Sequence, residues 1–203
     1  MNSHIDSVAA LRQLYAEPKG RAVKKQIAQL DVHCRRFISL SPFLVLATSD
    51  GAHNMDASPR GGEPGFAKVT EEGDLLIPDS PGNNRLDSFQ NIVAVGKVGL
   101  LFMIPGIDET LRVNGSAVLS RAADDIAACT TERRAPKLVI RVAVEAAYLH
   151  CAKAFMRSRL WEPASRLDPS ALPTIAEMIG DQTGDRVAPE TREAMALRYA
   201  PDL

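Results

Sequence analysis

The chain has 203 residues, a length typical of one domain or at most two. Hydrophobic residues make up 45% and charged residues 24%, which excludes the disordered and fibrous classes of protein. The 24 Lys and Arg residues are balanced by 25 Asp and Glu residues, giving a formal net charge of −1. Binders of nucleic acid or of membranes carry a basic excess, so the composition argues against both and any anion site must be local.

Arginine dominates the basic residues, with 17 Arg against 7 Lys. Arginine binds phosphate and carboxylate through two parallel hydrogen bonds, but a GC-rich coding sequence gives the same excess. Composition leaves both explanations open, and the positions of the arginines must decide between them.

The sequence is typical of a soluble, cytoplasmic protein. Residues 1–15 lack the basic and apolar segments of a secretory signal. No apolar run approaches the ~18 residues that a membrane helix needs. Cys34, Cys129 and Cys151 are odd in number and widely spaced, which fits free thiols in a reducing compartment.

The first forty residues are expected to be helical. Apolar residues recur at helical spacing from Val8 to Tyr15, and a breaker follows at residues 17–20. A second helix is predicted from Arg21 to Leu40. It should end before Ser41-Pro42, because proline disfavours the helical conformation of the residue before it.

The pattern then changes to short strands. Phe43 to Ala47 is an apolar run that ends at Asp50-Gly51, a hairpin signal, and residues 56–62 stand at the end of a strand. Alternating apolar and polar residues predict strands that have one buried face. The further predicted strands are Phe66 to Thr70, Leu75 to Pro78, Val98 to Ile104, Thr110 to Leu119 and Lys137 to Glu145.

These elements predict a mainly β protein with flanking helices. About six antiparallel strands would close into a barrel, because closure removes exposed strand edges. The organisation expected is an N-terminal helical region (1–41), a barrel (42–163) and a C-terminal helical tail that packs on the barrel (164–203). Helices are expected at Asn84 to Asn91, Asp124 to Thr131, Cys151 to Leu160 and Pro189 to Tyr199.

Several kinds of site have no support in the sequence. His33-Cys34 and His150-Cys151 are adjacent pairs and lack the spacing of metal ligands, so no metal site is predicted. The chain has no Gly-x-Ser-x-Gly elbow, no glycine fingerprint of a dinucleotide fold and no P-loop.

Two polar segments could bind an anion. Residues 56–62 place a serine hydroxyl and an arginine beside glycines that allow a ligand close to the backbone. Residues 81–88 form a turn before a helix N-terminus, where the helix dipole favours an anion. Arg85 would oppose that dipole unless an anion lay between them, and a phosphate would satisfy both. An ordinary polar turn with an N-cap at Asn83 or Asn84 is the alternative.

A third segment runs from His150 to Trp161. Lys153 and Arg157 are four residues apart and share one face of the predicted helix. Such pairs usually face solvent. Trp161, just before Pro163, suits stacking or an interface.

Taken in order, these motifs resemble the pyridoxamine 5′-phosphate oxidase-related family of FMN-binding split β-barrels, over roughly Arg35 to Pro163. The resemblance implies a homodimer with FMN in two equivalent clefts that both chains line, and a small-molecule substrate. The series that carries it is Ser58-Pro59-Arg60-Gly61, Leu76-Ile77-Pro78-Asp79, Gly82-Asn83-Asn84-Arg85-Leu86-Asp87-Ser88, Asn91, Gly99-Leu100-Leu101-Phe102, Ile104-Pro105-Gly106 and Leu111-Arg112-Val113-Asn114-Gly115.

The resemblance also assigns roles to residues. The strand from Ser58 through Pro59 to Arg60 would run along the isoalloxazine ring and ribityl chain, and Ile77, Pro78 and Asp79 would flank the ring. The remaining contacts implied are Arg85 with Asn84 and Ser88 at the phosphate, Thr110 as a polar contact, and Lys153, Arg157 and Trp161 as a wall from the second subunit.

The chain departs from the oxidases that give the family its name. Those enzymes carry an Arg-x-x-x-x-Lys strand and a C-terminal Trp-Gly-Gly…Arg segment. Here the strand reads Asp56-Ala57-Ser58-Pro59-Arg60, and the chain ends in Tyr199-Ala200-Pro201-Asp202-Leu203. We therefore expect an FMN-dependent oxidoreductase of unassigned substrate that oxidises pyridoxamine phosphate poorly, with no catalytic residue named. A deazaflavin-dependent reductase and a flavin-binding module without turnover are the alternatives.

Overall fold

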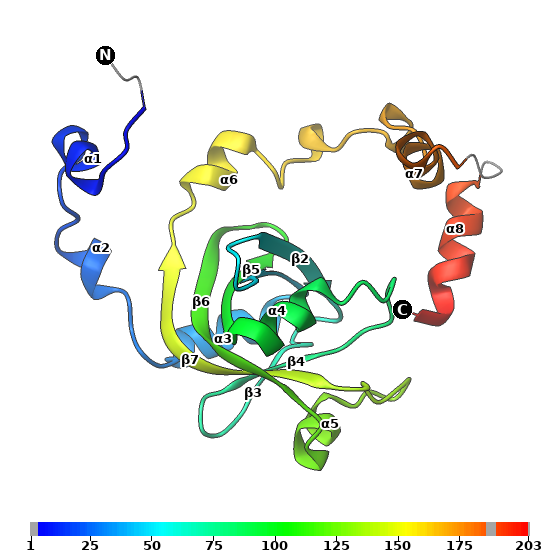
Figure 1. Cartoon of the computed structure of the whole chain (residues 1–203), viewed down its shortest axis with the longest axis horizontal. Helices are drawn as coiled ribbons and strands as arrows, with labels where there is room; N and C mark the ends of the chain where they lie inside the picture. Colours follow the sequence, from blue (N-terminus) through cyan, green and yellow to red (C-terminus); the bar gives the residue numbers. More distant parts are fainter. Residues whose placement is uncertain (1–3, 186–189, 203) are drawn as a thin grey trace.

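The protein is described here from a computed structural model that covers residues 4–185 and 190–202. Its centre is a seven-stranded antiparallel sheet in the order β2-β1-β5-β6-β7-β4-β3, curled into a half-barrel (Figure 1). The strands are β1 (Phe43–Ser49), β2 (Met55–Gly61), β3 (Lys68–Val69), β4 (Leu75–Pro78), β5 (Lys97–Ile104), β6 (Ile107–Ser120) and β7 (Val139–His150).

The predicted fold class, a mainly β split barrel with flanking helices, is confirmed. The strand number differs, because the described residues form seven strands and not six. The residue pattern placed residues 56–62 at the end of a strand, while the family resemblance made Asp56 to Arg60 a strand. The structure agrees with the second, because β2 pairs with β1 along its whole length, from Met55 opposite Ser49 to Gly61 opposite Phe43. Polar residues on its inner face hide this strand from a pattern based on hydrophobicity. The strand expected at residues 66–70 is reduced to the two residues of β3.

Helices surround the sheet. Pro189, where the last helix was expected to begin, lies outside the described residues, and α7 was not expected. The helices are α1 (Val8–Leu14), α2 (Arg21–Lys24), α3 (Val32–Leu40), α4 (Asp87–Val95), α5 (Ala123–Cys129), α6 (Lys153–Ser158), α7 (Ile175–Thr183) and α8 (Arg192–Tyr199). Short 3₁₀ turns are η1 (Pro163–Ser165), η2 (Pro169–Ala171) and η3 (Ala200–Asp202).

The single helix expected from Arg21 to Leu40 is wrong, because the chain breaks into α2 and α3. Between them Ile27 joins the sheet: its N–H donates to the Ala147 carbonyl at 3.0 Å and its carbonyl accepts from the Ala147 N–H at 2.8 Å. The Asp31 carboxylate then accepts from the Cys34 N–H at 2.8 Å and caps the start of α3. Tertiary pairing with β7 therefore overrides the helical pattern.

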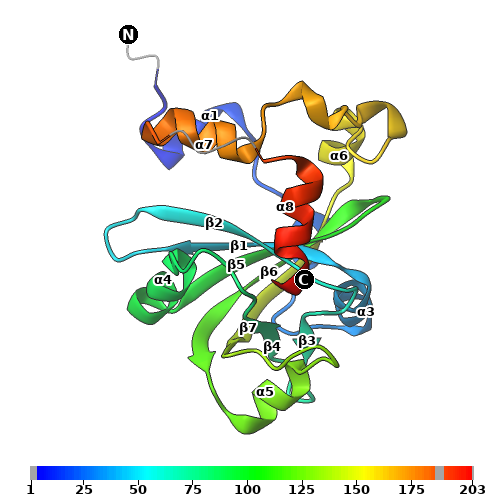
Figure 2. The ribbon, with the colours of Figure 1, turned by 90° about the vertical axis from the view of Figure 1, so that its right-hand side faces the viewer.

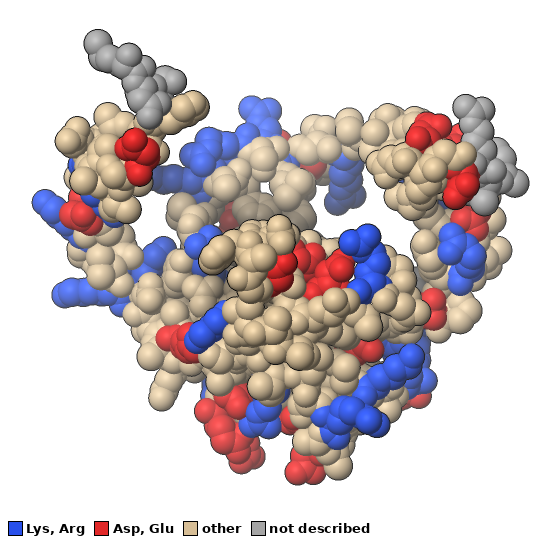
Figure 3. Space-filling model, in the orientation of Figure 1, with Lys and Arg blue, Asp and Glu red and all other residues tan. Residues whose placement is uncertain are grey.

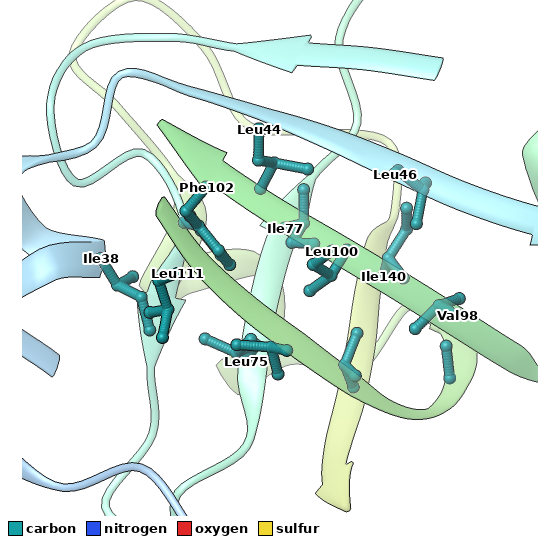
Figure 4. Packing of buried hydrophobic residues seen from close by; sticks show 14 of the residues in the cluster. Ile38, Leu44, Leu46, Leu75, Ile77, Val98, Leu100, Phe102, Leu111 and Ile140 are labelled. Carbon is teal, nitrogen blue, oxygen red and sulfur yellow. The ribbon is translucent and has the colours of Figure 1, made fainter. Parts of the chain in front are cut away.

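The barrel interior is filled by its own side chains. Leu44 and Leu46 from β1 meet Leu100 and Phe102 from β5 and Leu111 from β6, and all five are at most 1% exposed (Figure 4). An interior packed in this way leaves no lumen for a tricyclic ring, so a cofactor would have to bind outside it. The helices α3 and α4 pack against the barrel, and each contributes buried apolar residues to the same core.

The two ends of the chain stand apart from this core. In Figures 1 and 2, α1 and α7 lie above the barrel, on opposite sides of it. In the described part of residues 164–203 only Gly180 is buried. Packing of this tail on the barrel therefore stays a prediction. None of the described helices is long and apolar enough to cross a membrane.

Candidate functional site

Strand β2 turns a polar face toward the inside of the barrel wall. Its register with β1 places Asp56 opposite Thr48 and Arg60 opposite Leu44. Paired residues of antiparallel strands share a face, so Asp56, Ser58 and Arg60 lie on the face of the buried leucines, and all three are half-buried. The exposed residues of the strand, Pro59 among them, point the other way.

Arg60 is the least satisfied polar side chain of this face. Its Nε atom is buried and has no hydrogen-bond partner, while its guanidinium lies 5.2 Å from the centre of the Phe89 ring. Burial lowers the pKa of Arg60, and the nearby carboxylates of Asp79 and Asp56 oppose that shift. Leaving a buried charged donor without a partner is costly, so this atom is suited to an acceptor supplied from outside the chain.

A hydrogen-bond network joins β1, β2 and α4. The Ser88 hydroxyl donates to Asp56 Oδ2 at 2.5 Å, and the Thr48 hydroxyl lies 3.5 Å from the same oxygen. Asn91 Nδ2 donates to Thr48 Oγ1 at 2.9 Å. Because Ser88 and Asn91 belong to α4, the network fixes the start of that helix against the polar face of β2.

The N-terminus of α4 has no side-chain cap. The residue before the helix, Leu86, and nearby Asn84 both have a φ of 60°, a left-handed conformation that is unfavourable for such side chains. Two left-handed residues explain why the helix begins at Asp87 and not at Asn84 as predicted. The first backbone N–H groups of a helix have no partner within it, and here no side chain caps them.

Arg85 lies beside this helix start. It is exposed, and its Nε donates to Asp87 Oδ2 at 2.8 Å, which raises the pKa of the guanidinium. The sequence predicted that a phosphate would offset the charge of Arg85 at this helix start. The Asp87 carboxylate in the first turn already supplies part of that negative charge. The guanidinium remains exposed, and its other nitrogens make no hydrogen bond within the described residues.

The structure brings together the predicted residues of β2, the loop after β4 and the start of α4. Arg60 interacts electrostatically with Asp79 and Asp56, and Arg85 with Asp56. Ile77 is fully buried in the core, so only its backbone could contact a ligand. Pro78 is half-buried at the end of β4.

The other predicted residues form a second group at β6 and α6. Thr110 is buried and pairs with His150 across β6 and β7. Trp161 Nε1 donates to the Ile107 carbonyl at 2.9 Å, and its ring stacks on Phe155 at 5.4 Å. Lys153 and Arg157 are exposed on α6. Among the described residues, no hydrogen bond, ion pair or ring contact connects α6 with Arg60 or Arg85.

Residues that the sequence argument did not place in the site also take part, namely Asp56, Thr48, Phe89 and Asn91. The hairpin signal at Asp50-Gly51 could have found the first two, because it sets the register that places Thr48 opposite Asp56. The contacts of α4 with β1 and β2 leave no local signal in the sequence.

The first group fits FMN on its own chemistry. A phosphate needs anion donors, and an uncapped helix start beside an exposed arginine offers them. The isoalloxazine ring and the ribityl chain carry acceptors for the free Arg60 Nε. Within the described ranges, no three His, Cys, Asp or Glu side chains come together to hold a metal ion.

The curled antiparallel sheet with flanking helices defines the class to which this chain belongs, the split β-barrels. A sequence model described as "Pyridoxamine 5′-phosphate oxidase" matches residues 30–151, which is more than half of the chain. The protein belongs to this family. A search of curated proteins found no match.

Solved structures give weaker likenesses. HupZ from Group A Streptococcus is 15% identical with a TM-score of 0.49, and the match covers 60% of this chain and 94% of HupZ. A putative pyridoxamine 5′-phosphate oxidase from Lactobacillus delbrueckii is 20% identical with a TM-score of 0.45, covering 59% and 93%. A conserved hypothetical protein from Mycobacterium tuberculosis is 12% identical with a TM-score of 0.44, covering 72% and 96%.

Proposed function

We propose that this protein is a cytoplasmic FMN-dependent oxidoreductase that acts on a small molecule of unassigned identity. The observation that carries the proposal is the buried Arg60 Nε without a partner, beside the uncapped start of α4. A bound flavin would supply an acceptor for the first and a phosphate for the second. Arg85, Asn84 and Ser88 would hold the phosphate, with Ser58, Pro59 and Asp79 along the cofactor.

The cofactor would lie between two copies of the chain. The filled barrel interior excludes an internal site, and at the edge of the first group Arg85 and Asp87 are exposed. Within the described residues of one chain, the segment with Thr110, Lys153, Arg157 and Trp161 forms no hydrogen bond, ion pair or ring contact with that group. We propose that the second copy brings this segment to the cleft, which makes the protein a homodimer with two equivalent sites.

When bound, the flavin supplies the electron transfer, and the chain contributes binding and orientation. Arg60 would orient the ring or the ribityl chain because the Asp56 network fixes its strand against α4. Trp161 would shield one side of the cleft from water. No side chain is required to move a proton, so we assign no catalytic residue.

Cofactor binding is tested directly by titration of the purified protein with FMN, followed by fluorescence quenching, and by the visible spectrum of the protein as isolated. We expect a yellow protein that releases FMN on denaturation. A colourless protein that fails to bind FMN would refute the proposal. Binding of a deazaflavin under the same conditions would then identify the cofactor instead.

Two substitutions locate the cofactor. Arg85→Ala should weaken FMN binding by about 1.5–3 kcal/mol if its guanidinium makes a charged hydrogen bond to the phosphate. Arg60→Met should also weaken it, yet leave the stability of the cofactor-free protein unchanged or higher, because the orphaned charged donor is lost. Arg36→Met, an exposed arginine on α3, is the matched control and should change neither quantity.

Turnover separates an enzyme from a flavin-binding module. The FMN-loaded protein is mixed with NADH or NADPH in the absence of oxygen, and the flavin absorbance is followed before and after oxygen or a quinone is added. Reduction and reoxidation over many cycles support an oxidoreductase. Pyridoxamine phosphate should be oxidised poorly, and rapid conversion would contradict that expectation.

A further inference from the structure

Both ends of the chain form arms that stand off the barrel. The N-terminal arm comprises residues 4–25, and the C-terminal arm comprises the described part of residues 164–202, namely 164–185 and 190–202. Figure 3 shows open space between each arm and the barrel, and Figure 1 shows the arms on opposite sides of it. Within the described residues, α1 and α8 contain no buried side chain and α7 contains only Gly180.

The arm helices are too short to be stable alone. They have seven (α1), nine (α7) and eight (α8) residues, while isolated helices below ~12–15 residues are marginal in water. Each nevertheless begins with a formed cap, from Ser7, Thr174 and Thr191 respectively, and Thr174 forms a full capping box with Glu177. Local sequence therefore specifies where these helices begin, and in this structure the barrel contributes no packing surface that buries their side chains.

Each arm presents an apolar surface that would fit the other. Val8 and Leu11 share one face of α1, Tyr15 follows at its C-cap, and the three are 39–73% exposed. Between α7 and α8 runs a groove of about 230 Å³, lined by Leu172, Ile175, Met178 and Met195 among others. That volume is below the ~300–1,000 Å³ of small-molecule sites, so the groove suits a few inserted side chains better than a cofactor.

The charges of the arms are complementary. Residues 4–25 carry five Lys and Arg against two Asp and Glu, and residues 164–202 carry seven Asp and Glu against four Arg. Some of these form ion pairs inside their own arm, as Arg12 does with Glu17 and Arg198 with Glu190.

Several other charged residues of the arms have no ion-pair partner among the described residues. The basic ones include Lys19, Arg21 and Lys24 in the N-terminal arm, and the acidic ones include Asp181, Asp185 and Glu193 in the C-terminal arm. Charge complementarity of this kind favours specific association and speeds it.

We propose that the N-terminal arm of one copy packs against the α7–α8 groove of a second copy, and the reverse, so that a two-fold dimer contains two identical arm-to-arm contacts. Val8, Leu11 and Tyr15 enter the groove, and the unpaired lysines and arginine meet the unpaired carboxylates. Residues of opposite arms do not meet within one chain in this structure, because α1 and α7 lie on opposite sides of the molecule (Figure 1). A second copy related by a two-fold axis carries the same two surfaces, so each N-terminal arm meets the C-terminal arm of the other copy.

This inference rests on the homodimer of the proposed function and adds to it. The C-terminal arm begins directly after Trp161, whose indole is held to β6 by the Ile107 carbonyl. Docking of that arm on the second copy would therefore fix the Trp161 segment relative to the partner's cleft.

The test is a charge exchange in the full chain. One variant reverses the N-terminal arm (Lys19→Glu, Arg21→Glu, Lys24→Glu), and the other reverses the C-terminal arm (Asp181→Lys, Asp185→Lys, Glu193→Lys). Sedimentation velocity should show a dimer for the original protein and a dimer weakened roughly tenfold or more for each variant alone. In an equal mixture both contacts again join opposite charges, so a heterodimer of original affinity should form. Its absence, or variants that dimerise like the original protein, would overturn the proposal, as would a monomeric original protein.

A second measurement does not depend on charge or on variant stability. Val8→Cys and Ile179→Cys are made in separate chains that also carry Cys151→Ser, mixed and oxidised. Cross-links between the two different chains support the arm-to-arm contact, and cross-links only between identical chains contradict it. Both experiments are run without FMN. If the mixed variants form the heterodimer but the protein binds no FMN, only the proposed cofactor is refuted. If the protein binds FMN but the mixed variants do not restore the dimer, only the arm contact is refuted.

Discussion

Helix α3 of the barrel and the arm helices α1, α7 and α8 have similar lengths of seven to nine residues, but they differ in what packs against them. In the barrel, α3 covers the core with Cys34, Phe37 and Ile38, all at most 9% exposed. In the arms, α1 and α8 bury nothing within their own chain. A well-capped helix therefore becomes a permanent part of this fold only where an apolar surface receives it, and the arms lack that surface in a single copy.

The largest expected effect contrasts a core leucine with an arm leucine. Leu46→Ala, in β1 and fully buried, should lower the free energy of unfolding by about 2–5 kcal/mol because it removes apolar contacts and leaves a cavity. Leu167→Ala, at 79% exposure in the C-terminal arm, should change it by less than about 0.5 kcal/mol. Urea denaturation followed by circular dichroism measures both. Equal losses would show that the arm belongs to the cooperative core.

Two glycines, one in strand β6 and one in a hairpin loop, allow a comparison within the barrel region. A Cβ at Gly115, where the pairing of β6 and β7 shifts register, would lie 2.2 Å from the Ala143 carbonyl oxygen. Gly115→Ala should therefore destabilise the fold by about 1–3 kcal/mol, since the backbone of β7 must move. Gly51→Ala, in the hairpin loop with no atom near its Cβ, should be neutral or slightly stabilising. Thermal unfolding of the two variants gives the comparison.

Helix caps provide a smaller test. Asp31→Ala removes the cap of α3 and should cost about 1 kcal/mol, while Ser7→Ala at α1 should leave global stability unchanged, because α1 lies outside the barrel. The Cys34 N–H bonded to Asp31 lowers the pKa of that carboxyl below its ordinary value. Its contribution is therefore complete above the ordinary pKa of about 4 and is lost as the pH falls through the lowered pKa.

The cap prediction is checked by urea denaturation between pH 7 and pH 3. The difference in the free energy of unfolding between the original protein and Asp31→Ala should become smaller as the pH falls. Asp31→Asn keeps a capping oxygen that does not titrate, so its stability relative to Asp31→Ala should stay constant across the same range. A difference that grows in acid would reverse the assigned role of Asp31.

The reactivity of the three cysteine thiols compares the buried core with the exposed end of β7, and it needs no measurement of stability. Burial raises the pKa of Cys34 and of Cys129 to about 11, whereas Cys151 is exposed where β7 leaves the barrel. A disulfide reagent at pH 8 should modify one thiol quickly and two only as fast as the protein unfolds. Cys151→Ser should remove the fast phase. Three fast thiols would show that the barrel opens readily.

Periodicity and turn signals predicted most of the barrel. The alternation in β5, β6 and β7 and the hairpin at Asp50-Gly51 reflect local chemistry, because a strand with one buried face must alternate. The pattern could not show that Ile27 leaves its helix to pair with Ala147, since that depends on a strand more than a hundred residues away. Asn84 and Leu86 have left-handed backbone conformations, so α4 begins later than predicted. Helix propensity does not reveal such conformations.

For the site, the sequence determined which residue types are available and the family to which they belong. Only the tertiary structure decided that Arg60 keeps a buried Nε without a partner and that Asp56, Ser88, Thr48 and Asn91 form one network. Only the tertiary structure decided, too, that the segment from Lys153 to Trp161 lies apart from them in one chain. The physical reason is that a side chain's hydrogen-bond partners and burial depend on strand register and helix packing, which join residues far apart in the sequence.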